Sequence, residues 1–311
     1  MSHYLGRVSM QHHNIYSVIM EADGAEVRAR TAGSLSRRFK GNADYPAVGD
    51  WVKLDRESGE NGDAVICEML ARKSALIRKE AGLGIQGQVI AANIDYVFIC
   101  MSLNQDYNLK RLDRYIAVSS CPGIIPIVVL TKADLNQEAE SMREEAMRRN
   151  PLIQVILCSD RQGVGFDRIR SIMTGNVTAA FIGSSGVGKS TIINRLLGTQ
   201  AMLTNAVRED DGKGRHTTTH RQLIRLEGGG TVIDTPGMRE LYLDGGNIGD
   251  AFSDIAELAA LCRFRDCSHL SEPGCAVKAA VESGKLSKTR YMNYLKLMKE
   301  KDNLKRKRRT W

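Results

Sequence analysis

A glycine-rich segment in the middle of the chain has the residue types and spacing that bind nucleotide phosphates. It fits the pattern G-x-x-x-x-G-K-[ST] and reads Gly183-Ser184-Ser185-Gly186-Val187-Gly188-Lys189-Ser190. An apolar run precedes it, and Thr191 to Leu197 has the composition of a helix. In this setting backbone N–H groups converge on phosphate oxygens at a helix N-terminus. Lys189 would reach the outer phosphates, and the Ser190 hydroxyl would bind Mg²⁺.

A second motif, which begins with an acidic residue, follows the next apolar run. Asp234-Thr235-Pro236-Gly237 comes directly after Thr231 to Ile233. An acid at the end of a strand downstream of a phosphate-binding loop (P-loop) is typical of the Mg²⁺ shell. Gly237 could bring its backbone N–H against a γ-phosphate, because it carries no Cβ.

A base-reading motif is predicted upstream of the P-loop. Thr131-Lys132-Ala133-Asp134 fits N/T-K-x-D and follows the apolar run 125–130. The Asp134 carboxylate can accept hydrogen bonds from both the ring N–H and the exocyclic amine of guanine, which predicts selection of GTP. Lys132 would lie along the base. After a further predicted strand, a backbone N–H at Ser159 would contact the guanine oxygen.

The order of these motifs is unusual. GTPases ordinarily present the P-loop first and the base-reading motif last, whereas here Thr131 precedes Gly183. The carboxyl ends of parallel strands meet at one edge of a sheet, so such a site depends on which strands are neighbours and not on chain order. The sequence therefore predicts a circularly permuted GTPase that uses GTP, GDP and Mg²⁺.

The elements that must position these motifs indicate a multidomain α/β protein. Short strands broken by turn residues predict a small β-barrel over residues 1–72, and a basic, glycine-rich stretch predicts a linker over 71–87. Continuous apolar strands alternating with helices predict a parallel sheet covered on both faces over 73–240. Helical segments predict a separate helical domain over 241–311.

Three cysteines and one histidine cluster in the last predicted domain. Their spacing is Cys262-x4-Cys267-x-His269-x5-Cys275. Three thiolates and one imidazole complete a tetrahedral set with no open position, which favours one structural Zn²⁺ over catalysis. The other four cysteines are scattered and show no secreted disulfide framework.

The net charge of +8 is concentrated at the C-terminal end. Residues 296–311 contain eight basic and two acidic residues, which favours a polyanionic partner, nucleic acid first. The alternative is a solvated end that only aids solubility. We find no signal-peptide pattern and no apolar run of about 20 residues, so we expect a cytoplasmic protein that is not inserted in a membrane.

The chain resembles the bacterial ribosome small subunit-dependent GTPase A family, also called RsgA or YjeQ. The resemblance rests on the permuted motif order, on Gly214-Arg-His-Thr-Thr218 and on the segment Cys262 to Cys275. It implies an N-terminal OB-fold, a central GTPase domain and a C-terminal zinc domain. It also implies a role in late maturation of the small ribosomal subunit, with that subunit and its rRNA as partners. We expect the protein to be a monomer.

The segment between the P-loop and Asp234 raises the question of catalysis. A threonine here closes on Mg²⁺ in GTPases, and Thr217 and Thr218 are both candidates. The water-orienting glutamine of many GTPases is replaced by Met238, which cannot take that role. The resemblance suggests that His216 orients the water, and the alternative is a contact to RNA. Thr131 replaces the asparagine of many GTPases, so we expect the base-reading loop to lose a bracing side chain.

Two rival functions are consistent with parts of the sequence. One is an RNA-binding module with a vestigial nucleotide site, which the complete set of motifs disfavours. The other is a membrane-associated regulatory GTPase, which the lack of lipidation signals disfavours. Because Asp234 lies close to the predicted zinc domain in the chain, we expect nucleotide state to be coupled to rRNA binding.

Overall fold

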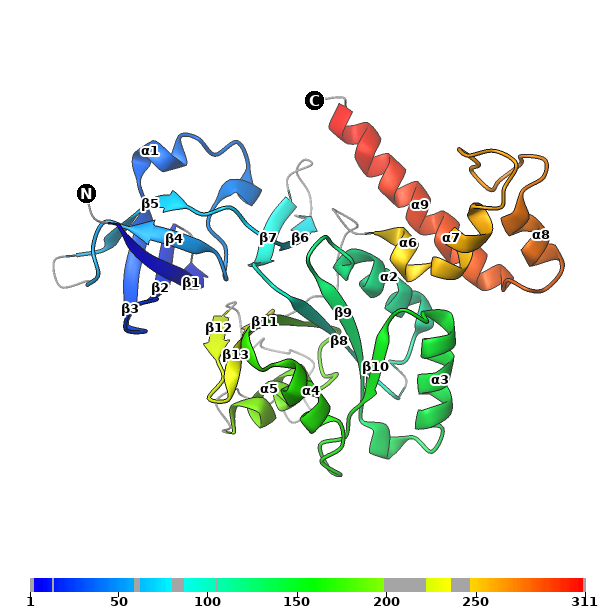
Figure 1. Cartoon of the computed structure of the whole chain (residues 1–311), viewed down its shortest axis with the longest axis horizontal. Helices are drawn as coiled ribbons and strands as arrows, with labels where there is room; N and C mark the ends of the chain where they lie inside the picture. The colour runs from blue at the N-terminus through cyan, green and yellow to red at the C-terminus, as the bar shows by residue number, and fades with distance from the viewer. Residues whose placement is uncertain are drawn as a thin grey trace, which may run out of the picture.

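The computed structural model describes residues 3–12, 14–58, 62–79, 87–104, 106–198, 222–235 and 247–309. Figure 1 shows the arrangement of its helices and strands. In chain order these elements are β1 (Tyr4–His12), β2 (Ile15–Met20), β3 (Glu26–Thr31), α1 (Gly33–Ser36), η1 (Asn42–Asp44), β4 (Trp51–Leu54), β5 (Ala64–Met69), β6 (Ala75–Lys79), β7 (Gly87–Ala92), β8 (Tyr96–Ser102), α2 (Leu109–Ser119), β9 (Ile125–Thr131), η2 (Ala133–Leu135), α3 (Ala139–Arg149), β10 (Gln154–Leu157), α4 (Phe166–Ile172), β11 (Gly175–Ile182), α5 (Lys189–Leu197), β12 (Gln222–Arg225), β13 (Gly229–Asp234), α6 (Ile248–Ala251), α7 (Ser253–Ala259), α8 (Ala276–Glu282) and α9 (Lys288–Arg309).

The N-terminal strands close into a small barrel. β1 pairs antiparallel with β2 and β4, β3 pairs parallel with β5, and β5 returns to β4, so the pairing runs around a ring. Alternate side chains point inward, as in β2, where Tyr16, Val18 and Met20 are buried. Closure leaves few unpaired strand edges. The predicted OB-like barrel is confirmed.

The stretch expected to be a linker contains regular structure. Within it β6 forms, and β6 pairs antiparallel with β7 from Ala75↔Ala92 to Lys79↔Gly87. Leu76 of β6 and Ile90 of β7 are fully buried. This segment therefore contributes a hairpin that packs against the protein, in addition to connecting the barrel to the following sheet.

The central sheet has the strand order β10-β9-β8-β11-β13-β12. All neighbours in it are parallel except β12, which runs antiparallel to β13. Alternate side chains of β8 point into two different hydrophobic cores, one on each face of the sheet. Val97 and Ile99 pack on the side of α2, whereas Phe98 and Cys100 pack on the side of α4 and α5. The predicted parallel sheet covered on both faces is confirmed.

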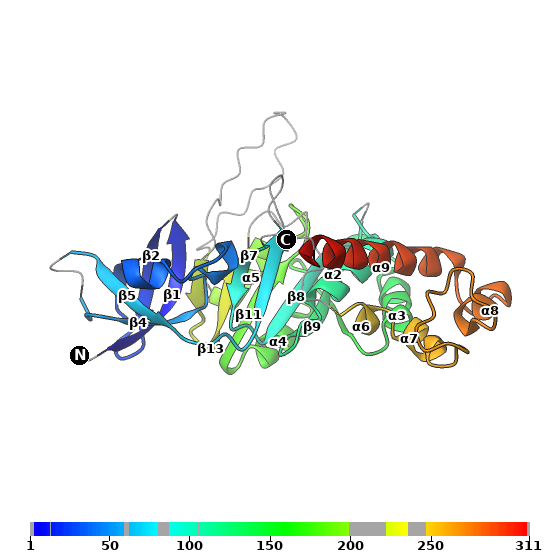
Figure 2. The same cartoon turned by 90° about the horizontal axis from the view of Figure 1, so that it is seen from above.

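The barrel is joined to the central sheet by a buried arginine and by a strand contact. Met10 of β1 pairs with Gln222 of β12. The Arg7 guanidinium donates to the Gly49 carbonyl at 3.1 Å and to Thr178 Oγ1 of β11 at 2.9 Å. Burial lowers the pKa of Arg7 to about 10. Figures 1 and 2 show the barrel at one end of an elongated molecule.

The C-terminal helices pack at the opposite end, on the face of the sheet that carries α2. Phe252, Ile255 and Leu297 share one buried core with Ile116 of α2. In both views α9 runs beside α2 (Figures 1 and 2). The N–H of Arg290 approaches Ser287 Oγ at 3.5 Å, at the start of α9. Among the described residues, no helix has the length and apolar character needed to cross a membrane.

Candidate functional site

The segment with the P-loop pattern connects β11 to α5, as the sequence predicted. Gly183 has a φ of +145°, and a Cβ at this position would lie 2.2 Å from the Cys100 carbonyl oxygen of β8. Gly186 and Gly188 also have positive φ values, of 75° and 97°. These conformations are open to glycine and disfavoured for other residues. The loop therefore turns tightly at the carboxyl end of the strand, at positions where only glycine fits without strain.

Lys189 lies inside this loop. Its side chain is largely buried, and Nζ donates to the carbonyl oxygens of Gly183 at 2.8 Å and Ser184 at 2.7 Å. Burial lowers the pKa of Lys189, while the charges of Cys100, Asp234 and Asp106 act in the opposite direction. The ammonium is thus held at the position where the pattern predicts contact with phosphate oxygens.

Asp234 lies next to the P-loop strand at the end of β13. It pairs with Phe181, two residues before Gly183, and its side chain is 4% exposed. Burial raises its pKa, and the Lys189 cation opposes that shift. Both pKa shifts arise mainly from burial of the charged group, and each of the two charges partly offsets the shift of the other. Ser190, in the first turn of α5, offers the hydroxyl predicted to bind the same metal.

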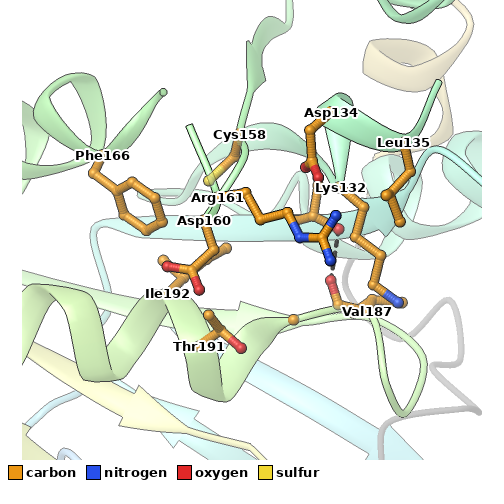
Figure 3. Close-up of a pocket in the computed structure, with 12 residues that line it drawn as sticks. Lys132, Asp134, Leu135, Cys158, Asp160, Arg161, Phe166, Val187, Thr191 and Ile192 are labelled. Carbon is orange, nitrogen blue, oxygen red and sulfur yellow. Dashed lines mark hydrogen bonds between the residues drawn. The ribbon is translucent and has the colours of Figure 1, made fainter. Parts of the chain in front are cut away.

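A cavity of about 260 Å³ opens beside the P-loop. Its walls come from the ends of β9 and β10 and from α5. Figure 3 shows Asp134, Lys132 and Arg161 gathered around it. The lining residues are Thr131, Lys132, Asp134, Leu135, Cys158, Asp160, Arg161, Phe166, Val187, Gly188, Thr191 and Ile192. Three of the predicted base-reading residues therefore line the same cavity as Val187 and Gly188 of the phosphate-binding loop.

The Asp134 carboxylate is oriented by a neighbouring loop. Ser159 Oγ donates to Asp134 Oδ1 at 2.6 Å, which ties the β9 loop to the β10 loop. Lys132 adopts the left-handed conformation, with a φ of 57°. Sequence reasoning gave Ser159 only a backbone contact to the base. In the structure its N–H instead donates to the Val164 carbonyl oxygen at 3.1 Å, and its side chain makes the contact to Asp134.

Thr131 corrects one expectation. Its side chain is buried, and Oγ1 donates to the Val187 carbonyl of the P-loop at 2.6 Å. We expected that replacing asparagine with threonine would remove a brace from the base-reading loop. That expectation was wrong, because the shorter hydroxyl still reaches the P-loop backbone.

Sequence reasoning gave no side-chain role to several residues of this pocket, among them Asp160, Arg161 and Phe166. Arg161 and Phe166 line the cavity, and Asp160 pairs with Arg195 of α5 at 3.0 Å. The available signal was position, because all three follow the β10 strand within a few residues of Ser159. None of the nucleotide-binding motifs assigns a role to the side chains at these three positions.

Several predicted residues fall outside the described part of the chain. These are His216, Thr217, Thr218 and Gly237. Their predicted roles, in catalysis and in Mg²⁺ and γ-phosphate binding, stay predictions.

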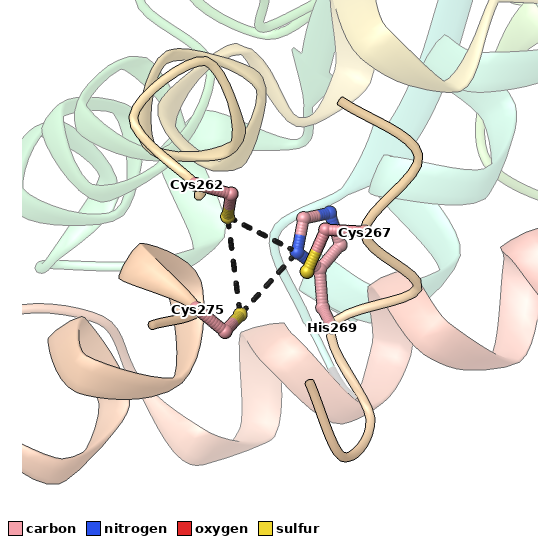
Figure 4. A group of neighbouring side chains, drawn as sticks. All are labelled: Cys262, Cys267, His269 and Cys275. Carbon is pink, nitrogen blue, oxygen red and sulfur yellow. Dashed lines mark hydrogen bonds between the residues drawn. The ribbon is translucent and has the colours of Figure 1, made fainter. Parts of the chain in front are cut away.

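The four predicted zinc ligands meet in the C-terminal region. The ligand atoms of Cys262, Cys267, His269 and Cys275 all lie within 4.8 Å of one another (Figure 4). His269 Nδ1 is 3.6 Å from Cys262 Sγ and 3.5 Å from Cys275 Sγ, and these two sulfurs are 3.9 Å apart. A tetrahedral Zn²⁺ with ordinary bond lengths requires about 3.6 Å between S and N and about 3.8 Å between two sulfurs. The donor set therefore fits Zn²⁺.

The local backbone explains how these ligands converge. Cys262 follows α7, and Cys275 precedes α8, where its Sγ accepts from the N–H of Lys278 at 3.5 Å. A thiolate is favoured at a helix N-terminus. The loop between them turns at His269, which has a φ of 62° and is 6% exposed.

A parallel sheet with a P-loop after β11, and a base-reading pocket built from strands that precede it in the chain, defines a circularly permuted P-loop GTPase. The family model described as RsgA GTPase matches residues 69–244, and the chain belongs to this family.

Relatives and solved structures agree with that assignment. Small ribosomal subunit biogenesis GTPase RsgA 2 of Lactiplantibacillus plantarum is 46% identical over 296 residues, covering 95% of this chain and 83% of the relative. The crystal structure of YjeQ from Thermotoga maritima superposes with a TM-score of 0.71 at 25% identity and covers 96% of this chain and 98% of that one. The structure of YloQ, a circularly permuted GTPase, gives a TM-score of 0.67 at 27% identity, with coverage of 97% and 96%.

Proposed function

We propose that this chain binds the small ribosomal subunit and hydrolyses GTP to GDP and phosphate during late maturation of that subunit. The observation that carries the proposal is the single cavity shared by the P-loop and by the Asp134 carboxylate, which Ser159 orients. The relative from Lactiplantibacillus plantarum carries small-subunit biogenesis in its name. Family membership and this pocket together support a guanine-specific hydrolase.

Each site residue has a proposed role in nucleotide binding. Asp134 accepts from the guanine ring and amine, Lys132 lies along the base, and Ser159 orients the Asp134 carboxylate through its hydroxyl. The loop backbone, with Lys189, holds the β- and γ-phosphates. Residues proposed to contact GTP are Thr131, Lys132, Asp134, Ser159, Gly183, Ser184, Ser185, Gly186, Val187, Gly188, Lys189, Ser190, Thr191, Asp234 and Gly237.

Hydrolysis proceeds by positioning and charge stabilisation. When bound, Mg²⁺ neutralises charge on the phosphate oxygens. Ser190 and Asp234 would hold it, with Thr217 or Thr218 completing the set. Lys189, already aimed into the loop, stabilises the negative charge that grows on the β–γ bridge. His216 is proposed to orient the attacking water.

The flanking regions are proposed to bind rRNA. We propose an OB-fold domain over 1–72, a GTPase domain over 73–240 and a zinc domain over 241–311. Cys262, Cys267, His269 and Cys275 would hold one structural Zn²⁺, which locks the short helices α7 and α8 together. The basic residues of α9 match the phosphate charge of RNA. We further propose a cytoplasmic monomer whose affinity for the subunit depends on the bound nucleotide.

Sedimentation with purified small subunits tests this function. We expect the protein to pellet with subunits more strongly with a non-hydrolysable GTP analogue than with GDP, and to lose binding as salt rises. Removal of residues 305–309 should weaken binding and flatten its salt dependence. Equal pelleting with both nucleotides would contradict the proposed dependence of subunit binding on the bound nucleotide. It would not affect the assignment of the protein as a GTP hydrolase.

Single-turnover hydrolysis tests the catalytic role. His216→Ala should lower the rate of GTP cleavage with little change in nucleotide affinity, because its contact acts in the transition state. A wild-type rate in this variant would exclude His216 as the water-orienting group. Lys189→Ala, in contrast, should damage nucleotide binding, turnover or both.

A further inference from the structure

A single carboxylate gathers four donors in the loop between the zinc ligands. Glu272 Oε1 accepts from the backbone N–H of Ser268 at 2.9 Å and from its hydroxyl at 2.5 Å. Glu272 Oε2 accepts from the N–H groups of Leu270 and Ser271, both at 3.1 Å. Both oxygens are therefore used, and both bind the same short loop.

These donors lie on either side of one ligand. Ser268 and Leu270 are the immediate neighbours of His269, so Glu272 fixes the backbone before and after it. His269 has a φ of 62°, a left-handed conformation that non-glycine residues rarely adopt and that strains the backbone. Such a conformation persists only where contacts from the surrounding structure hold it in place.

A second contact fixes the same residue from the opposite side. The Tyr291 hydroxyl of α9 donates to the His269 carbonyl oxygen at 2.5 Å. With the backbone held in this way, Nδ1 points at the sulfurs of Cys262 and Cys275 (Figure 4). Glu272 is also three residues before Cys275, so the turn that it closes connects the last two ligands.

We propose that Glu272 is a positioning residue of the zinc site, which holds His269 in its strained conformation so that the imidazole reaches the metal. This inference rests on the zinc centre proposed above. Glu272 touches none of the ligand atoms in the described contacts, and it acts through the loop. Outer-sphere partners of this kind change metal affinity by about 10- to 100-fold when they are removed.

Chelator-driven zinc release from the full-length protein tests the proposal. Glu272→Ala should release zinc about 10- to 100-fold faster than wild type. Glu272→Gln keeps the size of the side chain but turns an amide N–H₂ toward backbone donors, so it should also release zinc faster. Glu257→Ala removes the same charge from an exposed position on α7 and should behave as wild type.

Cobalt substitution gives a readout that loop stability alone would not change. In the wild type, Co²⁺ should show the visible spectrum of a tetrahedral site with three thiolates and one imidazole. In Glu272→Ala and Glu272→Gln the bands should shift or weaken, because His269 no longer holds its position. If Glu272→Ala fails to fold, the cobalt spectrum of Glu272→Gln alone tests whether Glu272 positions His269.

Two results would overturn the proposal, and they are distinguishable. Wild-type protein that carries zinc, together with Glu272 variants whose zinc release and cobalt spectra match the wild type, would refute the role of Glu272 alone. Wild-type protein that binds neither zinc nor cobalt would refute the zinc centre and this inference with it.

Discussion

Arg290 of α9 and Asp113 of α2 form a buried ion pair across 177 residues of chain. Arg290 donates to Asp113 Oδ1 at 2.8 Å, and the two side chains are 4% and 0% exposed. Asp113 also pairs with Arg149 at the end of α3, and Asn293 donates to it at 2.8 Å. Arg290 reaches Asp254 of α7 as well. One cluster therefore fastens the C-terminal helices to two helices of the GTPase sheet.

We expect Arg290→Met to destabilise the protein by about 3–5 kcal/mol, because buried Asp113 loses one of its two cations and the carbonyl oxygens of Arg149 and Ala251 lose their Arg290 donor. Chemical denaturation followed by circular dichroism measures this. Arg114 and Glu300 also join α2 to α9 but are 28% and 24% exposed, so Arg114→Met should cost about 1 kcal/mol or less. Equal losses of unfolding free energy in both variants would mean that the buried Arg290 pair stabilises the protein no more than the exposed Arg114 pair does.

The hydroxyl of Thr131 gives a second prediction. Thr131→Val should lower affinity for GDP and GTP, because the buried Val187 carbonyl loses its donor at a cost of about 1–3 kcal/mol. Titration with a fluorescent GDP analogue measures the change. Thr131→Ser keeps the hydroxyl and should stay close to wild type, and a Ser variant as weak as the Val variant would instead implicate the lost methyl group.

Base choice gives a third prediction. Asp134→Asn should weaken guanine nucleotides and favour xanthine nucleotides, since an acceptor is partly exchanged for a donor. Competition binding with GDP and XDP measures the preference. Asp160→Asn is a matched control, because Asp160 lines the same cavity but pairs with Arg195. Retained guanine preference in Asp134→Asn would contradict the assignment of the pocket.

The zinc site gives a fourth prediction. Freshly purified protein should contain one Zn²⁺ per chain, and Cys267→Ser should expose residues 261–284 to limited proteolysis while nucleotide binding persists. Elemental analysis and mass spectrometry of the fragments measure both effects. Metal-free protein that resists proteolysis in this segment would show that the short helices hold together without zinc.

Local patterns were enough to predict much of the structure. Helix α2 covers Leu109–Ser119, where the apolar residues have a helical period and the Asn108 side chain caps the first turn, and both of these signals are local. The zinc ligands and the P-loop were found in the same way. The hairpin of β6 and β7 was missed because its glycine-rich, basic sequence resembles a connection. The Asp113–Arg290 pair could not be predicted, since its members lie on separate elements and many other charges could have been their partners.

The strand order of the central sheet has a consequence for synthesis. β8, β9 and β10 are the first strands of the central sheet to be made and are contiguous in it, so they can assemble with α2 and α3 before the rest of the domain has left the ribosome. Until β11 arrives, the apolar edge of β8 has no partner strand within this sheet. Such an edge is prone to pair with other chains. The nascent protein must therefore shield this edge while the P-loop half is still being translated.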